Sequence, residues 1–201
     1  GDKMRGYVLL AMLLLTGMLN ANPLLVEEPK SDTKPSFETE QLVFWLEPGK
    51  WRMEGDYGFV NFSSDPIRQA ILFPIPSDSL QSMAYDISVT LGSDHKPLQI
   101  TSVNEQGFWF DLVLPEFSFD TVHIGYSQRL YGNSASYILL SALAWGKPLR
   151  YVSYTLHADP ILQLESLPFG NPEESVTEGM NTYQWDFFDF VPKTNFDVRW
   201  Y

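Results

Sequence analysis

The stretch MAYDISVTL, residues 83–91, alternates apolar and polar side chains along its whole length. Alternation with a period of two residues is typical of a β-strand that buries one face. The segments 50–59 and 121–128 show the same period, which predicts two further half-buried strands. The inward positions expected in 83–91 are Met83, Tyr85, Ile87, Val89 and Leu91.

Strand-like and turn-like stretches continue on both sides of these segments, at intervals of about 10 to 15 residues. Turns rich in Gly, Pro, Asn, Ser and Asp separate them, and no amphipathic helix intervenes. The pattern predicts an all-β fold, a single-domain antiparallel β-sandwich of the immunoglobulin-like or jelly-roll-like kind. The additional strands are expected at 69–75, 98–103, 107–114, 135–145 and 151–157.

The segment 135–145, ASYILLSALAW, is ambiguous because its apolar run also suits a helix. Its tyrosine and isoleucine near the start, and the Gly-Lys-Pro sequence that follows at 146–148, favour a buried strand.

The chain ends with YQWDFFDFVPKTNFDVRWY, residues 183–201, in which eight side chains are aromatic. Tyr183, Trp185 and Phe187 share one face, and the apolar positions after them change parity, as a β-bulge would produce. We therefore expect most of these rings in the core, Trp185 and Trp200 in particular. The alternative is a platform of rings for a ligand such as a sugar.

Charge and composition argue against several classes of function. The 201 residues carry 25 acidic and 13 basic side chains, a formal net charge of -12. This disfavours nucleic acid or an anionic membrane surface as a partner, because phosphate binding needs clustered positive charge. The absence of cysteine excludes disulfides, zinc–thiolate sites and thiol nucleophiles.

The N-terminal segment predicts export. Residues 4–21, MRGYVLLAMLLLTGMLNA, combine a basic start, a short apolar run and a small residue at a cleavage position, which is the layout of a secretory signal peptide. We expect 1–21 to be a removed signal peptide, 22–40 a linker or extended lead-in, and 41–201 the β-sandwich domain. The mature protein would be periplasmic, on the cell surface or extracellular. In the alternative, residues 7–26 stay uncut as a membrane anchor.

No reactive constellation stands out in the sequence. His95, His123 and His157 are far apart and form no H-x-x-x-H or H-E-x-x-H spacing. His157 and Asp159 are expected to be an ordinary exposed pair. The sequence therefore predicts no catalytic residue, no cofactor and no metal site, and it leaves the ligand-binding residues unknown.

Three weaker features complete the search. The segment 132–136, GNSAS, lacks the last glycine of the G-x-S-x-G motif and is expected to be a turn. The acidic segment 171–181 lacks calcium-loop spacing and is expected to be a solvated loop. Paired carboxylates for glycoside hydrolysis stay open, because tertiary proximity is invisible in sequence. The acidic residues near aromatic rings are Glu116, Asp120, Asp186 and Asp189.

Three longer stretches carry a resemblance: GDYGFVNFSSDPIRQAILFPIPSD (55–78), SYILLSALAWGKPLRYVSYTLHADP (136–160) and YQWDFFDFVPKTNFDVRW (183–200). In this order they resemble an uncharacterised family of exported bacterial proteins, a domain of unknown function. The resemblance covers roughly residues 40–201. It implies a signal peptide and a β-sandwich-like fold, and no activity.

The sequence favours a non-catalytic exported domain of the bacterial envelope that binds an unknown protein or glycan. A glycan-binding module or glycan-directed enzyme is the first alternative, and it would need outward aromatic rings beside two carboxylates. A membrane-anchored component of an envelope assembly is the second. The burial of Trp109, Trp145 and Trp185 bears directly on this choice.

Overall fold

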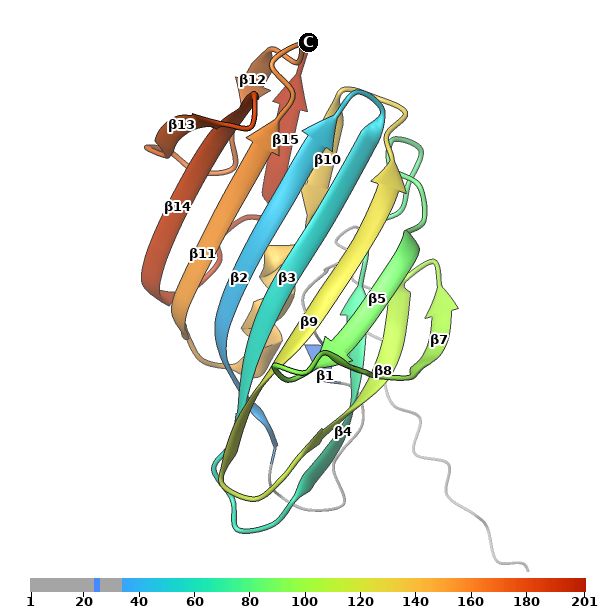
Figure 1. The fold of residues 1–201 in the computed structure, drawn as a ribbon, viewed down its shortest axis with the longest axis vertical. Coiled ribbons are helices and arrows are strands. Elements are labelled where there is room, and N and C mark those ends of the chain that lie inside the picture. The colour runs from blue at the N-terminus through green and yellow to red at the C-terminus, as the bar shows by residue number, and fades with distance from the viewer. Residues whose placement is uncertain (1–23, 26–33) are drawn as a thin grey trace, which may run out of the picture.

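The protein is mostly β-structure. The computed structural model describes residues 24–25 and 34–201, and the expected signal segment 1–21 lies outside them. The described residues form sheets of eight, four and three strands. The eight-stranded sheet lies in front in Figure 1, and the smaller sheets pack behind it. None of the helices in this part of the chain is long and apolar enough to span a bilayer.

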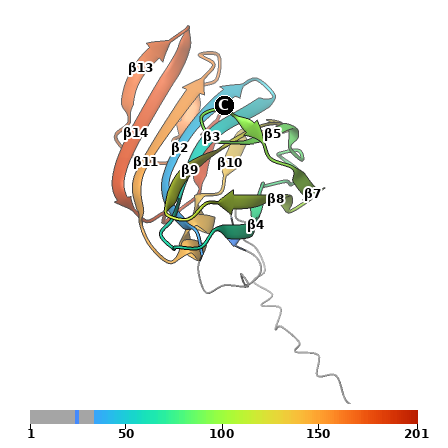
Figure 2. The ribbon, with the colours of Figure 1, turned by 60° about the horizontal axis from the view of Figure 1, so that its bottom comes forward.

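The eight-stranded sheet has the order β13-β14-β11-β2-β3-β9-β5-β6. β13 is the outermost strand on one side in both views (Figures 1 and 2). The strands are β2 (Ser36–Glu47), β3 (Lys50–Asn61), β5 (Tyr85–Leu91), β6 (Lys96–Pro97), β9 (Ser118–Arg129), β11 (Leu149–Ala158), β13 (Glu173–Thr177) and β14 (Met180–Phe190).

The smaller sheets have the orders β1-β4-β8-β7 and β10-β15-β12. The first contains β1 (Leu24–Leu25), β4 (Ile67–Pro74), β7 (Ile100–Asn104) and β8 (Gly107–Leu114). The second contains β10 (Ser134–Tyr137), β12 (Leu164–Ser166) and β15 (Phe196–Trp200).

The core lies between the large sheet and the two smaller ones. Alternate residues of β3 and β9 point into it, as the period of two predicts, and Trp51, Met53, Tyr57, Phe59 and Val122 are all 0% exposed. Aromatic contacts cross the layers. The Phe44 ring of β2 lies 4.3 Å from the Phe196 ring of β15, and the Tyr57 ring lies 5.5 Å from the Phe73 ring of β4. Burial of each such ring contributes roughly 1.5–3 kcal/mol.

The all-β prediction is confirmed, but the pairing is not purely antiparallel. Among the described strands, β2 and β11 form the one parallel pair, in which Thr39 lies opposite Tyr151 and Leu46 opposite Ala158. This pair joins the β13-β14-β11 half of the large sheet to the other half.

The strand expected at 135–145 is wrong beyond its first residues. β10 ends at Tyr137, and a short 3-10 helix follows at Leu139–Trp145. Gly146 ends the helix in the left-handed conformation (φ 71), and its N–H donates to the Leu143 carbonyl at 3.1 Å. An apolar run of this length has no decisive period, so packing rather than pattern sets its conformation.

The expected lead-in 22–40 contributes strands. β2 begins at Ser36, before the boundary expected at residue 41, and Leu24 pairs with Leu72 of β4. Glu38 and Glu40 at the start of β2 are both buried. The Lys147 ammonium donates to the Glu38 carboxylate, which accounts for one of these charges.

The aromatic C-terminus divides between core and surface. Trp185 and Trp200 are 4% and 6% exposed, which confirms both as core residues, whereas Phe188 is 76% exposed. The predicted bulge is wrong, because β11 and β14 keep one register from Ala158–Asn181 to Leu149–Phe190. Asp189 adopts a left-handed conformation instead (φ 48), and Phe190 beyond it packs against the core.

Candidate binding cleft at the sheet edge

A cleft opens at the end of the molecule where β12 faces the β13–β14 hairpin, and it is called the edge cleft here. It is widely open to solvent and offers a volume of about 460 Å³. Small-molecule sites typically occupy roughly 300–1,000 Å³, so the edge cleft is large enough for a small ligand. Its lining residues are Leu164, Glu165, Ser166, Leu167, Pro168, Phe169, Gly170, Glu174 and Tyr183.

Aromatic side chains give the edge cleft a firm wall. Tyr183 lies at an inward position of β14, and its ring stacks on the buried Trp185 ring at 6.5 Å and 21°. The Phe169 ring meets Trp185 edge-on at 5.9 Å. Because Trp185 is fixed in the core, it holds the two half-buried rings at the cleft.

Two exposed carboxylates, Glu165 and Glu174, line the same cleft, and Glu174 lies opposite Tyr183 in the sheet. Neither forms a salt bridge within the described residues. Burial, followed by the charge of Glu174, raises the pKa of Tyr183 above its usual value, so its hydroxyl stays neutral at physiological pH.

The chain segment that lines the edge cleft is acidic, and the nearest basic residue along the paired strands is Arg199 of β15, opposite Ser166. Between residues 151 and 192 the chain has no lysine or arginine. Negative charge of this density attracts cations over a distance of about one Debye length, roughly 8 Å at physiological salt. The same segment carries Asp159, Glu165, Glu173, Glu174, Glu178, Asp186 and Asp189.

The segment 171–181, expected to be a loop, is a β-hairpin. β13 and β14 pair from Glu173–Gln184 to Thr177–Met180. Glu178 and Gly179 between them have φ values of 52 and 82, the positive values of a type I′ turn. The strand is hard to recognise because all five of its residues are exposed, and only the Glu-Gly dipeptide signals the turn.

A second hollow lies on the outer face of the large sheet. Its volume is about 310 Å³. It is lined by Glu54, Asp56, Ser88, Thr90, His95 and His123 together with neighbouring residues of β3 and β9. Gly125 lies opposite Glu54 and Ser88 in the sheet, and its lack of a side chain leaves room there.

The hollow brings together two histidines that are far apart in sequence. The His95 and His123 rings lie 4.5 Å apart, which the spacing alone did not reveal. His123 is already engaged: its Nδ1 lies 2.6 Å from Asp56 Oδ1 and its Nε2 lies 3.2 Å from the Gly92 carbonyl. Glu54 pairs with Arg52. Within the described residues no group of three or more His, Asp or Glu side chains could hold a metal ion.

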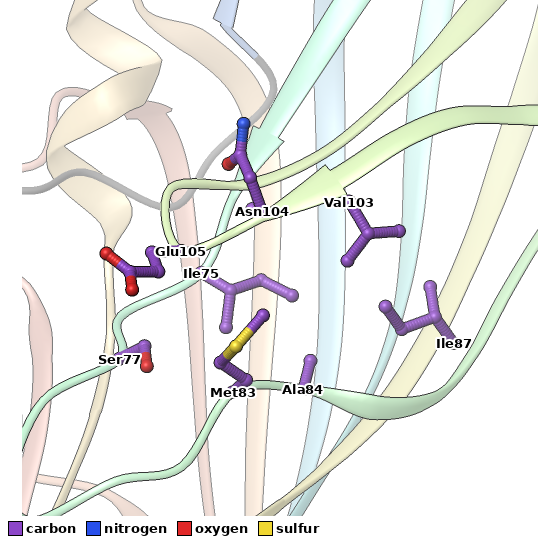
Figure 3. A pocket seen from close by; sticks show the side chains of 9 residues that line it. Ile75, Ser77, Met83, Ala84, Ile87, Val103, Asn104 and Glu105 are labelled. Carbon is purple, nitrogen blue, oxygen red and sulfur yellow. The ribbon is translucent and has the colours of Figure 1, made fainter.

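A third, apolar pocket lies at the opposite edge of the sheets (Figure 3). Ile75, Met83, Ile87 and Val103 turn toward a common space of only about 10 Å³. This volume is below the range of typical ligand sites. Met83 and Val103 are 45% and 51% exposed, so the inward position expected for Met83 is not reached.

The remaining sequence candidates do not assemble into a site. His157 Nδ1 contacts the Thr182 hydroxyl at 2.9 Å, and Asp159 accepts the Ile161 N–H at 2.9 Å, so the two are not joined. The Ser136 hydroxyl donates to Asp197 at 2.6 Å. Ser136 lies in β10, which begins at Ser134, so only the start of the expected turn at 132–136 is bent. Glu116 and Asp120 lie before and within β9, and three strands separate β9 from β14, which carries Asp186 and Asp189.

The tryptophans also fall into different environments. Trp109 and Trp145 are half-buried, and Trp145 packs on Phe37 and Phe59 at 5.6 and 5.5 Å. Trp45, which the sequence analysis did not single out, lies on the outer face of β2, with the Arg52 guanidinium 4.3 Å from its ring centroid. The edge cleft is lined by Tyr183 rather than by a tryptophan.

Comparison with known proteins supports the fold and leaves the family open. No family model matches the chain, and no curated protein is similar to it. Of what the resemblance to an uncharacterised exported family implied, only the mostly β fold is shown.

Among solved structures, a Legionella pneumophila protein described as a candidate nutrient binding protein superimposes with a TM-score of 0.68. The two share 14% identity over 90% of this chain and 70% of that one. An M1 zinc metallopeptidase of Deinococcus radiodurans gives a TM-score of 0.48 at 11% identity, over 82% of this chain and 42% of the peptidase. At these identities the likeness to the Legionella protein shows a shared fold.

Proposed function

We propose that this chain is an exported, non-catalytic binding domain, built as a β-sandwich, that takes a positively charged ligand in the edge cleft. The observation that carries the proposal is the position of Tyr183. Its ring is backed by Trp185, lies opposite Glu174 in the sheet, and shares the cleft with a second carboxylate, Glu165.

The chemistry of the edge cleft suits a cation attached to an apolar stem. An ammonium or guanidinium over an aromatic face gains about 0.5–2 kcal/mol, depending on how far it is desolvated. A carboxylate about 4 Å away adds about 1 kcal/mol in water and more near a protein surface. Leu164, Leu167 and Phe169 offer contacts for the stem.

Two further observations support the proposal. The Legionella protein with the same fold is described as a candidate nutrient binding protein, which agrees with a binding role. The layout of residues 4–21 favours export, and we place the protein in the bacterial envelope on that basis.

Titration of the isotope-labelled protein with argininamide tests the ligand class. We expect weak, saturable binding, on the order of millimolar Kd, with the largest amide shift changes at Tyr183, Phe169 and Glu174. Glu174→Gln should weaken binding several-fold. Glu54→Gln is the matched control, because Glu54 lies in the other hollow, and it should leave the affinity unchanged.

Two results would contradict the proposal. One is the absence of saturable shifts near the edge cleft. The other is an equal loss of affinity in Glu174→Gln and Glu54→Gln, since this would show that net charge rather than the cleft attracts the ligand.

A glycan ligand is the second candidate, because a tyrosine ring beside two carboxylates also suits a sugar. Neutral oligosaccharides added to the same sample would separate the two classes. Saturable binding of an oligosaccharide that persists in 0.5 M salt, roughly three times physiological, would favour the glycan. A cationic ligand should instead be released as the salt rises.

The anchored alternative concerns the N-terminus and is tested separately. If the signal segment is removed on export, the intact mass of the protein from its native host lacks residues 1–21. A mass that retains them would favour a membrane-anchored component of an envelope assembly.

A further inference from the structure

β13 is an open edge strand. Its five residues, Glu173–Thr177, are all exposed, and no described residue pairs with its outer side. A free edge offers backbone N–H and C=O groups to any extended segment that approaches it. β13 contains no proline or lysine and keeps a regular register with β14, so the common devices that block such pairing are missing, apart from its acidic side chains.

Hairpin geometry shows which backbone groups are free. In a two-residue hairpin the closing pair, here Thr177–Met180, exchanges both hydrogen bonds, and bonded and non-bonded pairs then alternate. Glu174 and Val176 therefore belong to the non-bonded pairs, and their N–H and C=O groups point to the free edge. Their side chains share one face of the strand, and that of Glu174 lines the edge cleft.

We propose that β13 binds an extended, positively charged peptide as an additional strand, with alternate basic side chains of the peptide entering the edge cleft. This inference rests on the proposed function and specifies its ligand. Peptide residues opposite Glu174 and Val176 would point to the same side of the sheet as those two residues. A lysine or arginine there meets Glu174, Glu165 and the Tyr183 ring.

Charge selects this occupant over a second copy of the chain. Glu173, Glu174 and Glu178 lie within the hairpin, so two such edges placed together would bring like charges into opposition. A basic peptide strand would instead place positive side chains opposite these carboxylates, and the charges would attract. The outer edge of β7, with the sequence ITSVN, carries no charge and offers no such selection.

The test uses a short, capped peptide that alternates lysine and threonine, and a copy methylated at alternate backbone nitrogens. The full-length protein is titrated with each by fluorescence anisotropy. We expect the parent peptide to bind. The copy whose methyl groups sit on the nitrogens that face β13 should bind at least about tenfold more weakly, because strand pairing needs those N–H groups.

A pair of protein variants tests the same edge from the other side. Val176→Pro removes an N–H that faces solvent, and edge strands accept proline at such positions. It should weaken the parent peptide by about tenfold, whereas Val176→Thr, which keeps the N–H, should not. Circular dichroism confirms that both variants stay folded. Val103→Pro on β7 is the control for an uncharged edge and should leave binding unchanged.

The outcomes separate this inference from the proposed function. Equal binding of the two peptides, with argininamide still bound at Tyr183, would overturn strand addition and leave the cationic cleft intact. Loss of peptide binding in Val103→Pro but not in Val176→Pro would show that the peptide binds at β7. This result would also overturn strand addition to β13. If argininamide and both peptides fail to bind, the cleft proposal fails as well.

Discussion

A glutamate lies near tyrosine side chains both at the centre and at the edge of the large sheet, but the two carboxyl groups have opposite surroundings. At the centre, Glu40 of β2 is 0% exposed, and its carboxyl group accepts hydrogen bonds from Tyr154 at 2.7 Å and Tyr137 at 3.4 Å. Tyr137 also contacts the Tyr57 hydroxyl at 2.8 Å. At the edge, Glu174 is exposed and faces a half-buried tyrosine without an ionic partner.

The difference shows that surroundings, rather than residue type, decide what an acid beside tyrosines does. Burial raises the pKa of Glu40 to about 8, so the group is largely neutral at pH 7 and acts as a polar connection within the core. Glu174 is exposed and lines the edge cleft, where a ligand can reach it. The centre therefore stabilises one structure, and the edge retains the capacity to bind.

Removal of the core tryptophans should have the largest effect. Trp185→Ala and Trp200→Ala each delete a nearly buried ring, and such truncations cost about 3–5 kcal/mol of unfolding free energy. Urea unfolding followed by circular dichroism measures the change, unless the variant fails to accumulate in soluble form. Phe188→Ala is the control and should cost less than about 0.5 kcal/mol, because Phe188 is 76% exposed. Near-native stability of both tryptophan variants would remove the core assignment.

Glu40 should make stability depend on pH in the direction opposite to that of an ordinary carboxylate. The folded protein keeps a proton that the unfolded chain releases above its usual pKa of 4.5. The contribution of Glu40 is therefore complete below about pH 4.5, falls as the pH rises toward 8, and then levels off. The slope is at most about 1.4 kcal/mol per pH unit.

Glu40→Gln isolates this effect, because the amide is similar in shape and does not titrate. The difference in unfolding free energy, Glu40→Gln minus original protein, should rise by a few kcal/mol between pH 5 and pH 8.5. This magnitude corresponds to a shift of about two units or more in the pKa of Glu40. A difference that is flat with pH would mean that Glu40 ionises normally in the core.

Removal of the cleft tyrosine should have a smaller effect on stability. Tyr183→Ala deletes a half-buried ring that rests on Trp185, and we expect a cost of about 1–2 kcal/mol, less than half of that for Trp185→Ala. Thermal and urea unfolding of the two variants side by side give the comparison. Equal costs would make Tyr183 a core residue rather than a ligand contact.

Chelation of metal ions should not change the thermal stability of the protein. The described residues contain no cluster suited to a metal ion, and the chain has no cysteine. Melting temperatures with and without excess EDTA should agree within about 1 °C, since a bound stabilising ion at 100 times its Kd would contribute about 2.7 kcal/mol. A drop of several degrees would reveal a site that the structure does not suggest.

Sequence reasoning predicted the centre of the molecule better than its edge. The alternation in 50–59 and 121–128 reports burial directly, so the inward residues of β3 and β9 could be read from it. The run 139–145 failed because a fully apolar segment has no period to report. β13 was missed for the opposite reason, since a fully exposed strand has no buried face.

The candidate site depends on contacts that no local pattern encodes. Phe169 precedes β13 and Tyr183 follows the hairpin turn, and the edge cleft exists only because β12 and β14 face each other. The signal that was present is the run of residues 151–192 without a lysine or arginine. Together with the Glu-Gly turn, it would have directed attention to this part of the chain.

The parallel pair of β2 and β11 has a consequence for how the chain folds. Thr39 must meet Tyr151, which comes after five strands of the sheet, so the two halves of the sheet cannot join until distant parts of the chain pair. Long-range pairing of this kind slows folding, because the entropy of a large loop is lost before the contact forms. Until then β2 exposes an apolar strand edge, which is open to pairing with another chain. We therefore expect refolding to be slow and its yield to fall with protein concentration, as is typical of a rate-limiting step that competes with aggregation.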